Sequence, residues 1–141
     1  MNAEKLAKAL DNDNNEQILT LTLSKIKEMN MSVLKELHLS KADTLELLKK
    51  LNGYKYVDEL DDLKYGTYIR WVDLKDPNVI QLEKGAIFCE TRVADWGISL
   101  VCKNFGFRTK YFQFPLDDHL VFQKLTDQEN IILAALEHLN K

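Results

Sequence analysis

YGTYIRWVDL, residues 65–74, begins a stretch that decides the fold and ends at Leu125. Within it, β-branched and aromatic residues come in short alternating runs that turn-forming residues separate. The later runs are AIFCETRV (86–93), ISLVCKN (98–104), RTKYFQF (108–114) and LVFQKL (120–125). About five strands of this length at regular spacing are typical of a small antiparallel barrel. We therefore expect an α+β protein built around an SH3-like or Tudor-like barrel, an interpretation that rests on strand number and length.

The turns between these runs predict how the strands follow one another. Asp95-Trp96-Gly97 indicates a tight hairpin between the runs at 86–93 and 98–104. KDPN at 75–78 predicts a stiff turn before a further short strand at Val79–Leu82. Strict alternation within 86–93 places Ile87, Cys89, Thr91 and Val93 on one face and Ala86, Phe88, Glu90 and Arg92 on the other.

Sequence rich in Leu and Lys predicts a helical arm over residues 1–53. A short helix is expected at 3–10, ended by the polar cluster that follows it. Residues 16–29 favour a helix, although their TLTL run leaves a strand as the alternative. Residues 32–52 predict a helical hairpin, with Ser32 as a cap for its first helix and Ser40 as a cap for its second.

The remaining residues, 54–141, are expected to form the barrel domain, with a C-terminal helix at 127–140. Its first segment, YKYVDELDDLK at 54–64, is acidic and predicts a short helical crossover. Thr126 and Glu129 form a capping box ahead of an apolar stripe at helical spacing. Because a helix of this length is marginal alone, we expect it to dock on the open end of the barrel or on the N-terminal helices. That docking would bury Ile132, Leu136 and Leu139.

Composition and charge argue against several classes of protein. The chain has 141 residues, 45% of them hydrophobic, and suits one compact domain or a small domain with an appendage. Its net charge of -3 argues against a dedicated DNA or RNA coat protein, although residues 64–125 hold nine Lys or Arg against seven Asp or Glu. Without an apolar run of about 18 residues or a secretory h-region, the chain is expected to be soluble and intracellular. Cys89 and Cys102 lie in strand patterns and indicate buried free thiols, with a disulfide left open if their strands pair.

No constellation of residues for catalysis, metal binding or a cofactor stands out. His38, His119 and His138 have no second His or Cys at metal-ligand spacing. The acids within 58–62 lack the spacing of a calcium loop, and the pair Asp117-Asp118 is typical of a turn. The sequence contains no GxGxxG, GxxxxGK[ST] or GxSxG motif. We therefore expect a protein that is not an enzyme and that uses no metal or cofactor.

Aromatic and cationic side chains gather in the predicted sheet, and two interpretations of them compete. In the first, they anchor a protein interface. The candidates are Trp96, Phe105 and Phe107 in predicted loops, with Ile18 and Leu21 of the helical arm. In the second, aromatic rings stack on the bases of a single-stranded nucleic acid while cations hold its phosphates. The candidate cations are Arg70, Arg92, Lys103, Arg108 and Lys110. Since at least half of the rings must fill the core, we rank packing first, the protein interface second and the nucleic-acid site third.

Four segments carry a likeness to known sequences: YVDELDDLKYGTYIRWVDL (56–74), GAIFCE (85–90), VCKN (101–104) and LVFQKLTDQENIILAALEHLNK (120–141). They resemble short uncharacterised proteins encoded by nucleocytoplasmic large DNA viruses. The resemblance covers roughly Tyr54 to the C-terminus and carries over no catalytic or ligand-binding residue. It implies a viral protein made in the host cytoplasm, in one version packaged in the virion.

Taken together, these patterns predict a non-enzymatic viral protein-interaction module, either a virion component or an adaptor in a viral complex. Its partner would be another viral protein, or a second copy associating through the N-terminal helices. The alternative is a small barrel that binds single-stranded nucleic acid or RNA. A membrane partner is not expected.

Overall fold

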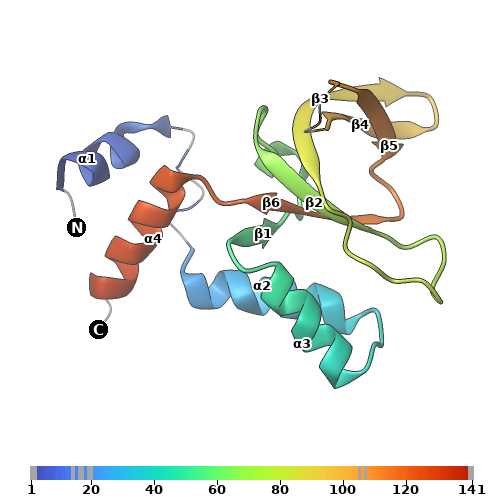
Figure 1. Ribbon diagram of the computed structural model, residues 1–141. Helices are drawn as coiled ribbons and strands as arrows, with labels where there is room; N and C mark the ends of the chain where they lie inside the picture. The colour runs from blue at the N-terminus through green and yellow to red at the C-terminus, as the bar shows by residue number, and fades with distance from the viewer. Residues whose placement is uncertain are drawn as a thin grey trace. The chain divides into compact units, whose positions relative to one another are not determined.

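The protein is described from a computed structural model (Figure 1). The structure describes residues 3–13, 15, 18, 21–104, 106 and 108–139. Contacts divide the chain into two compact units. The helical unit comprises Met1–Leu48 and Leu125–Lys141, and the sheet unit comprises Lys49–Lys124. Chain segments that precede and follow the sheet in sequence therefore belong to one unit.

Helices make up most of the described part of the helical unit. They are α1 (Ala3–Asp11), α2 (Leu23–Lys35), α3 (Lys41–Lys50), whose last two residues belong to the sheet unit, and α4 (Asp127–Leu139). α1 packs against α4. The buried core of the unit consists of Ala9, Ile18, Ile26, Leu125, Ile132 and Leu133. Short helices that would be marginal alone thus share one apolar core.

Side-chain caps fix where α3 and α4 begin. The hydroxyl of Ser40 accepts the Asp43 N–H at 3.1 Å. At α4 the predicted capping box is present: the Glu129 N–H donates to the Thr126 hydroxyl at 3.1 Å, and the Thr126 N–H donates to the Glu129 carboxylate at 3.0 Å. A side-chain cap of this kind contributes about 1 kcal/mol.

The helix boundaries differ from the sequence expectation at two places. α2 begins at Leu23, after a Thr22 cap, and runs through Ser32, which the sequence marks as a helix start. In α4, Ile132 is buried as expected and Leu136 is half-buried, but Leu139 is 77% exposed because the last turn extends beyond the core. α4 docks on α1, one of the two sites expected for it. Residues 16, 17, 19 and 20, which the sequence assigns to a helix, lie outside the described residues.

The sheet unit contains six antiparallel strands in the order β1-β6-β2-β3-β4-β5. They are β1 (Tyr54–Tyr56), β2 (Tyr68–Asp73), β3 (Ala86–Ala94), β4 (Gly97–Lys103), β5 (Tyr111–Pro115) and β6 (His119–Lys124), with a short 3-10 helix, η2 (Leu60–Asp62), in the acidic crossover. The expected closed barrel is wrong: the sheet is open, with β1 and β5 at its edges. The expected strand at Val79–Leu82 is reduced to a single bridge between Val72 and Leu82.

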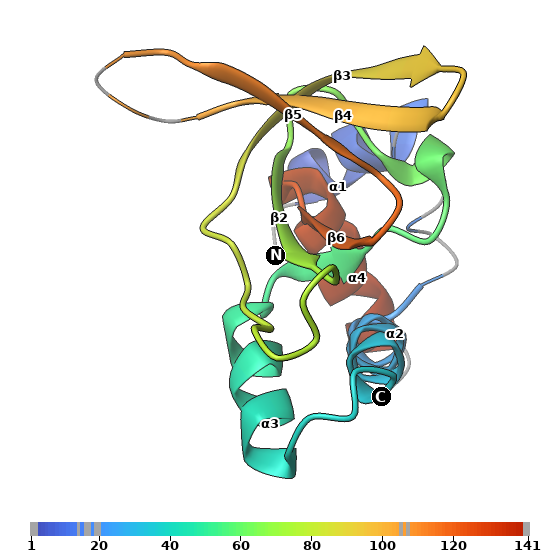
Figure 2. The same cartoon turned by 90° about the vertical axis from the view of Figure 1, so that its right-hand side faces the viewer.

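The open sheet is nevertheless strongly curled, because only Leu116–Asp118 joins β5 to β6. These strands are four strand spacings apart in the sheet, or about 19 Å if it were flat. The backbone from Pro115 to His119 spans about 15 Å at most. Backbone hydrogen bonds hold both ends of the link. The Leu116 N–H donates to the Ile98 carbonyl and the Leu74 N–H donates to the Asp118 carbonyl, each at 2.8 Å. β3, β4 and β5 consequently run across β2 and β6 (Figure 2).

The core of the sheet unit fills the concave side of this curl. It comprises Val57, Leu63, Ile69, Ala86, Phe88, Leu100, Cys102, Phe114 and Val121. Strict alternation fails in β3, where the register with β4 shifts between Phe88 and Glu90, which is a β-bulge. Beyond the bulge, Thr91 pairs with Leu100, so the inward positions of β3 change from even to odd numbers.

Gln123 of β6 holds the crossover segment in place. Its side chain is buried, at 1% exposure. Its Oε1 accepts the Lys64 N–H at 2.7 Å and the Thr67 hydroxyl at 3.0 Å, while its Nε2 donates to the Asp62 carbonyl at 3.0 Å. One buried amide therefore satisfies backbone groups on both sides of Leu63.

We predict that Gln123→Leu lowers the free energy of unfolding by about 2–3 kcal/mol, because it leaves the Lys64 N–H and the Asp62 carbonyl without their partner. Urea unfolding followed by circular dichroism measures the change. The same substitution at exposed Gln113 of β5 is the control and should shift stability by less than about 0.5 kcal/mol. Equal losses from both variants would contradict the assigned role of Gln123.

Gly85 gives a second test, because no side chain fits where it lies. Its φ is +104°, and an added Cβ would lie 2.5 Å from the Ile69 carbonyl oxygen. We predict that Gly85→Ala costs about 2 kcal/mol or more in thermal or urea unfolding. Gly66, with φ +82° and no atom within 4 Å of an added Cβ, is the matched control. Gly66→Ala should cost roughly 1 kcal/mol from backbone strain alone, so a larger loss there than at Gly85 would refute the steric explanation.

Candidate functional site

Of the five residues that the sequence proposes as protein-binding anchors, the structure describes three. Trp96 is 65% exposed in the turn between β3 and β4. Ile18 is 1% exposed, and Leu21 is half-buried against the same helical core, so both side chains are already used within the chain. Phe105 and Phe107 lie outside the described residues.

The candidate phosphate-binding cations are separated, and two of them are engaged. Arg70 Nε donates to the Glu83 carbonyl at 2.9 Å, and Arg92 Nε lies 3.1 Å from the Glu90 carboxylate in an exposed ion pair. Arg92 pairs with Ser99, whereas Lys103, Arg108 and Lys110 lie at or beyond the C-terminal end of β4. Ser99 and Lys103 are four residues apart, or about 13 Å along the strand.

The outer edge of β5 is not among the sites expected from the sequence. β5 pairs with β4 on one side and is the last strand in the sheet order. Two backbone hydrogen bonds continue this ladder beyond the ends of β5. The Asn104 N–H donates to the Lys110 carbonyl at 3.1 Å, and the Leu116 N–H donates to the Ile98 carbonyl at 2.8 Å. Backbone bonds alternate along an antiparallel strand. The even-numbered residues of β5 therefore direct their N–H and C=O groups at β4, and the odd-numbered residues direct theirs outward.

Tyr111 and Gln113 carry the outward donors. Among the residues that the structure describes, no hydrogen bond engages the N–H of either. Pro115, the last outward residue of the strand, has no N–H. The edge thus offers two donors and their neighbouring carbonyls over the length of one short strand.

Exposed aromatic side chains accompany this edge. Tyr111 is 67% and Phe112 38% exposed. On the concave face, the Phe112 ring lies 5.8 Å from Trp71, and the Phe114 ring stacks on Trp71 at 4.6 Å. β5 therefore has an anchored end at Phe114 and an uncovered end at Tyr111. Uncharged, aromatic edge strands are templates for pairing with another chain.

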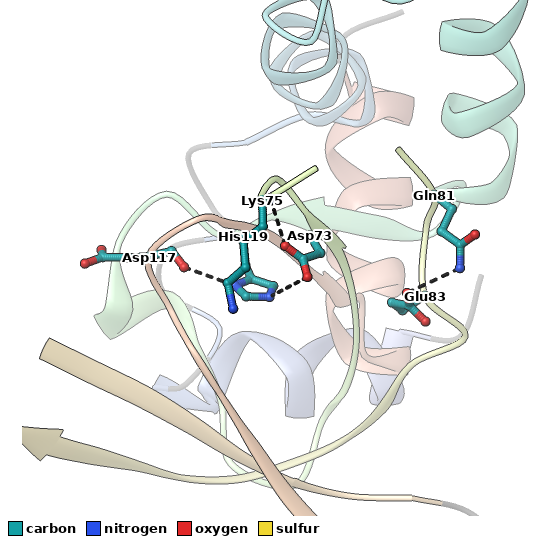
Figure 3. A network of polar contacts seen from close by, with 6 residues as sticks. All are labelled: Asp73, Lys75, Gln81, Glu83, Asp117 and His119. Atoms are coloured by element: carbon teal, nitrogen blue, oxygen red, sulfur yellow. Dashed lines mark hydrogen bonds and ion pairs between the residues drawn. The ribbon is translucent and has the colours of Figure 1, made fainter. Parts of the chain in front are cut away.

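A polar network surrounds the turn after β2 (Figure 3). The His119 side chain is 4% exposed, with its Nδ1 3.0 Å from the Asp117 carbonyl and its Nε2 3.9 Å from the Asp73 carboxylate. The same carboxylate accepts the Lys75 N–H at 2.9 Å. These contacts hold the turn and the link between β5 and β6 together.

A shallow pocket of about 270 Å³ lies beside that network, lined by Asp73, Lys75, Asp76, Val79, Gln81 and Glu83. Within the described residues, no group of three or more His, Cys, Asp or Glu side chains could hold a metal ion. Lys75 and the acids make this lining mixed in charge. The pocket gives no chemical preference for a ligand.

The two cysteines are free, and they differ in accessibility: Cys89 is half-buried at the bulge and Cys102 is fully buried. Burial, with a smaller contribution from the neighbouring Cys89, raises the pKa of the Cys102 thiol to about 12. Cys102 is therefore a core residue held in its protonated form.

Comparison with family models, with curated proteins and with solved structures finds no match to this chain. None of the helices in the described ranges is both long and apolar enough to cross a membrane.

We predict that iodoacetamide modifies Cys89 well before Cys102 at mildly alkaline pH, because the Cys102 pKa of about 12 leaves almost no thiolate. Mass spectrometry of the modified peptides measures both rates, and the urea-unfolded chain, in which the rates should converge, is the control. The raised pKa also sets how stability depends on pH. The contribution of Cys102 to stability is complete below pH 9.0 and is lost as the pH rises toward about 12. Equal labelling of the two thiols in the folded chain would contradict this assignment.

Proposed function

We propose that this protein is a non-enzymatic protein-interaction module that takes up an extended segment of a partner along the outer edge of β5. The partner segment adds to the sheet as a further antiparallel strand. Its backbone bonds to Tyr111 and Gln113, and its side chains cover the exposed rings of Tyr111 and Phe112. In this mode, main-chain hydrogen bonds supply affinity and alternate side chains supply specificity.

The observation that carries the proposal is the pair of outward N–H groups at Tyr111 and Gln113 next to exposed aromatic rings. Native proteins commonly protect an edge strand with a Lys, a Pro or a bulge in the strand itself. In β5 the protecting residues lie at or beyond its ends, at Lys110 and Pro115. The middle of the strand is left open to a partner.

The proposal also includes a finer fold class for the sheet and a viral context for the protein. A four-strand meander, β2 to β5, followed by a short link to β6 beside β2 supports an SH3-like or Tudor-like strand arrangement for the open sheet. The resemblance to short proteins of nucleocytoplasmic large DNA viruses supports a role in the host cytoplasm, as a virion component or as an adaptor in a viral complex. The separation of Arg92 from Lys103, Arg108 and Lys110 gives the nucleic-acid alternative less support than the protein interface.

We predict that Gln113→Pro abolishes binding at the edge while Gln113→Ala preserves it. Proline removes the outward N–H of residue 113 but no bond to β4, and it is tolerated on edge strands in this orientation. Selection of short peptides from a random display library on the full chain, followed by binding assays on all three proteins, measures the effect. Enriched sequences should favour β-branched and aromatic residues.

Circular dichroism and thermal unfolding of both variants confirm that the sheet is intact. If Gln113→Pro binds the enriched peptides as well as Gln113→Ala does, or if no peptide is enriched on a chain that stays monomeric, strand addition at β5 is refuted.

A further inference from the structure

We infer that the strand added at the β5 edge comes from a second copy of this chain, in a twofold-symmetric dimer where the two β5 strands pair antiparallel with Phe112 opposite Phe112. This inference rests on the proposed function, because it names the partner of the same edge. It differs from association through the N-terminal helices, whose residues Ile18 and Leu21 are buried or half-buried within the helical unit.

The hydrogen-bonding groups of the edge are complementary to themselves. With Phe112 on the twofold axis, Tyr111 of one copy lies opposite Gln113 of the other, and each such pair exchanges two backbone bonds. Every outward N–H and C=O of Tyr111 and Gln113 is then used. A register centred on Gln113 would set Tyr111 opposite Pro115, which has no N–H, and would leave the Tyr111 carbonyl without a donor. Of these two registers, the backbone therefore favours the one centred on Phe112.

The exposed side chains also match across this axis. Phe112 would face its counterpart in a non-hydrogen-bonded pair, the closer of the two pair types, with Cα atoms about 4.5 Å apart. Its ring is 38% exposed on the face that carries Trp71, so pairing covers the remainder. On the other face, the Tyr111 ring, 67% exposed, would lie over Gln113 of the second copy. Both faces of the junction thus bury apolar surface that one copy leaves in water.

Charge supplies an independent reason for a second copy and for the antiparallel direction. Exposed Arg108 and Lys110 precede β5, and exposed Asp117 and Asp118 follow it. An antiparallel pair sets the basic end of each strand beside the acidic end of the other, and the symmetry makes this attraction twice. A parallel pair would set like charges together at both ends. The charge pattern of this edge is thus complementary to itself.

The symmetry of the contact also limits its size. Each copy uses the same edge, so the two edges are consumed together and no further copy can add there. A junction of two short strands is smaller than a standard stable interface, so the dimer should be weak and concentration-dependent.

Sedimentation velocity and light scattering of the full chain, from about 1 μM to about 1 mM, test the dimer. Wild type and Gln113→Ala should pass from the monomer mass of 16.4 kDa to twice that mass as concentration rises. Gln113→Pro should remain monomeric throughout. A dimer that Gln113→Pro leaves intact would overturn the inference.

A charge exchange tests the direction of pairing. Arg108→Asp with Lys110→Asp makes both ends of β5 acidic, and Asp117→Lys with Asp118→Lys makes both ends basic. Each double variant alone should be monomeric at concentrations where wild type is dimeric, and an equimolar mixture of the two should dimerise again. A mixture that stays monomeric overturns the antiparallel arrangement.

Cysteine cross-linking tests the register. In the Phe112-centred register, Phe112→Cys brings two thiols within disulfide reach, whereas the thiols of Gln113→Cys are offset along the strands. Mild oxidation should give a covalent dimer of Phe112→Cys well above the wild-type background from Cys89 and little of Gln113→Cys. The reverse pattern, or cross-linking of neither, overturns the register proposed here.

The failure of this inference is distinguishable from that of the proposed function. If wild type is monomeric throughout but library peptides bind it and are lost with Gln113→Pro, the edge serves a different partner and self-pairing is refuted. If neither a dimer nor a peptide depends on residue 113, both proposals fail.

Discussion

A link of three residues, Leu116–Asp118, is the constraint on which the sheet unit depends. It joins two strands that the sheet order places far apart, and so it forces the sheet to bend until Phe114 of β5 stacks on Trp71 of β2. The buried His119 ring supports the same corner, 4.9 Å from Phe114 and next to the Asp117 carbonyl. The core is thereby covered by a curled sheet whose edge strands, β1 and β5, do not pair with each other. β5 therefore keeps one unpaired edge along its whole length, although it pairs with β4 on the other side.

Much of this architecture follows from local sequence signals. Runs of alternating apolar and polar residues predicted β2, β3, β4, β5 and β6, because each strand has one face in the core. Side chains alternate every two residues along a strand, so a few residues are enough to recognise the pattern. The capping box predicted the start of α4, because it needs only Thr126 and Glu129. The open form of the sheet, the role of Tyr54–Tyr56 as a strand and the bulge in β3 were not predictable in the same way. Each depends on which distant strand becomes a neighbour, as when Tyr54 pairs with Lys124.

The candidate site was harder to predict than the fold, for a related reason. Tyr111 and Gln113 are ordinary strand residues in the sequence, and only the strand order shows that their backbone groups face outward. Conversely, Ile18 is a large apolar residue of the kind found in interfaces, but it belongs to a core built from residues before and after the sheet. Trp96 was correctly placed at a hairpin turn from Asp95 and Gly97, which shows that local turn chemistry is readable where long-range pairing is not. The sequence does contain one local signal for this edge, an uncharged strand at residues 111–115 between the basic pair Arg108 and Lys110 and the acidic pair Asp117 and Asp118.

The place of β6 in the sheet has a consequence for how the chain is made. β6 is the last strand in sequence, yet it lies between β1 and β2 and supplies the pairing edge for both. During synthesis, β2 to β5 can pair as consecutive hairpins as soon as they leave the ribosome, but β1 has no partner until His119–Lys124 has emerged. α1 likewise waits for α4. Both units are therefore completed by residues 119–139, so folding is expected to finish only after this segment has left the ribosome, with the β1–β6 pairing and the α1–α4 contact as late, long-range steps.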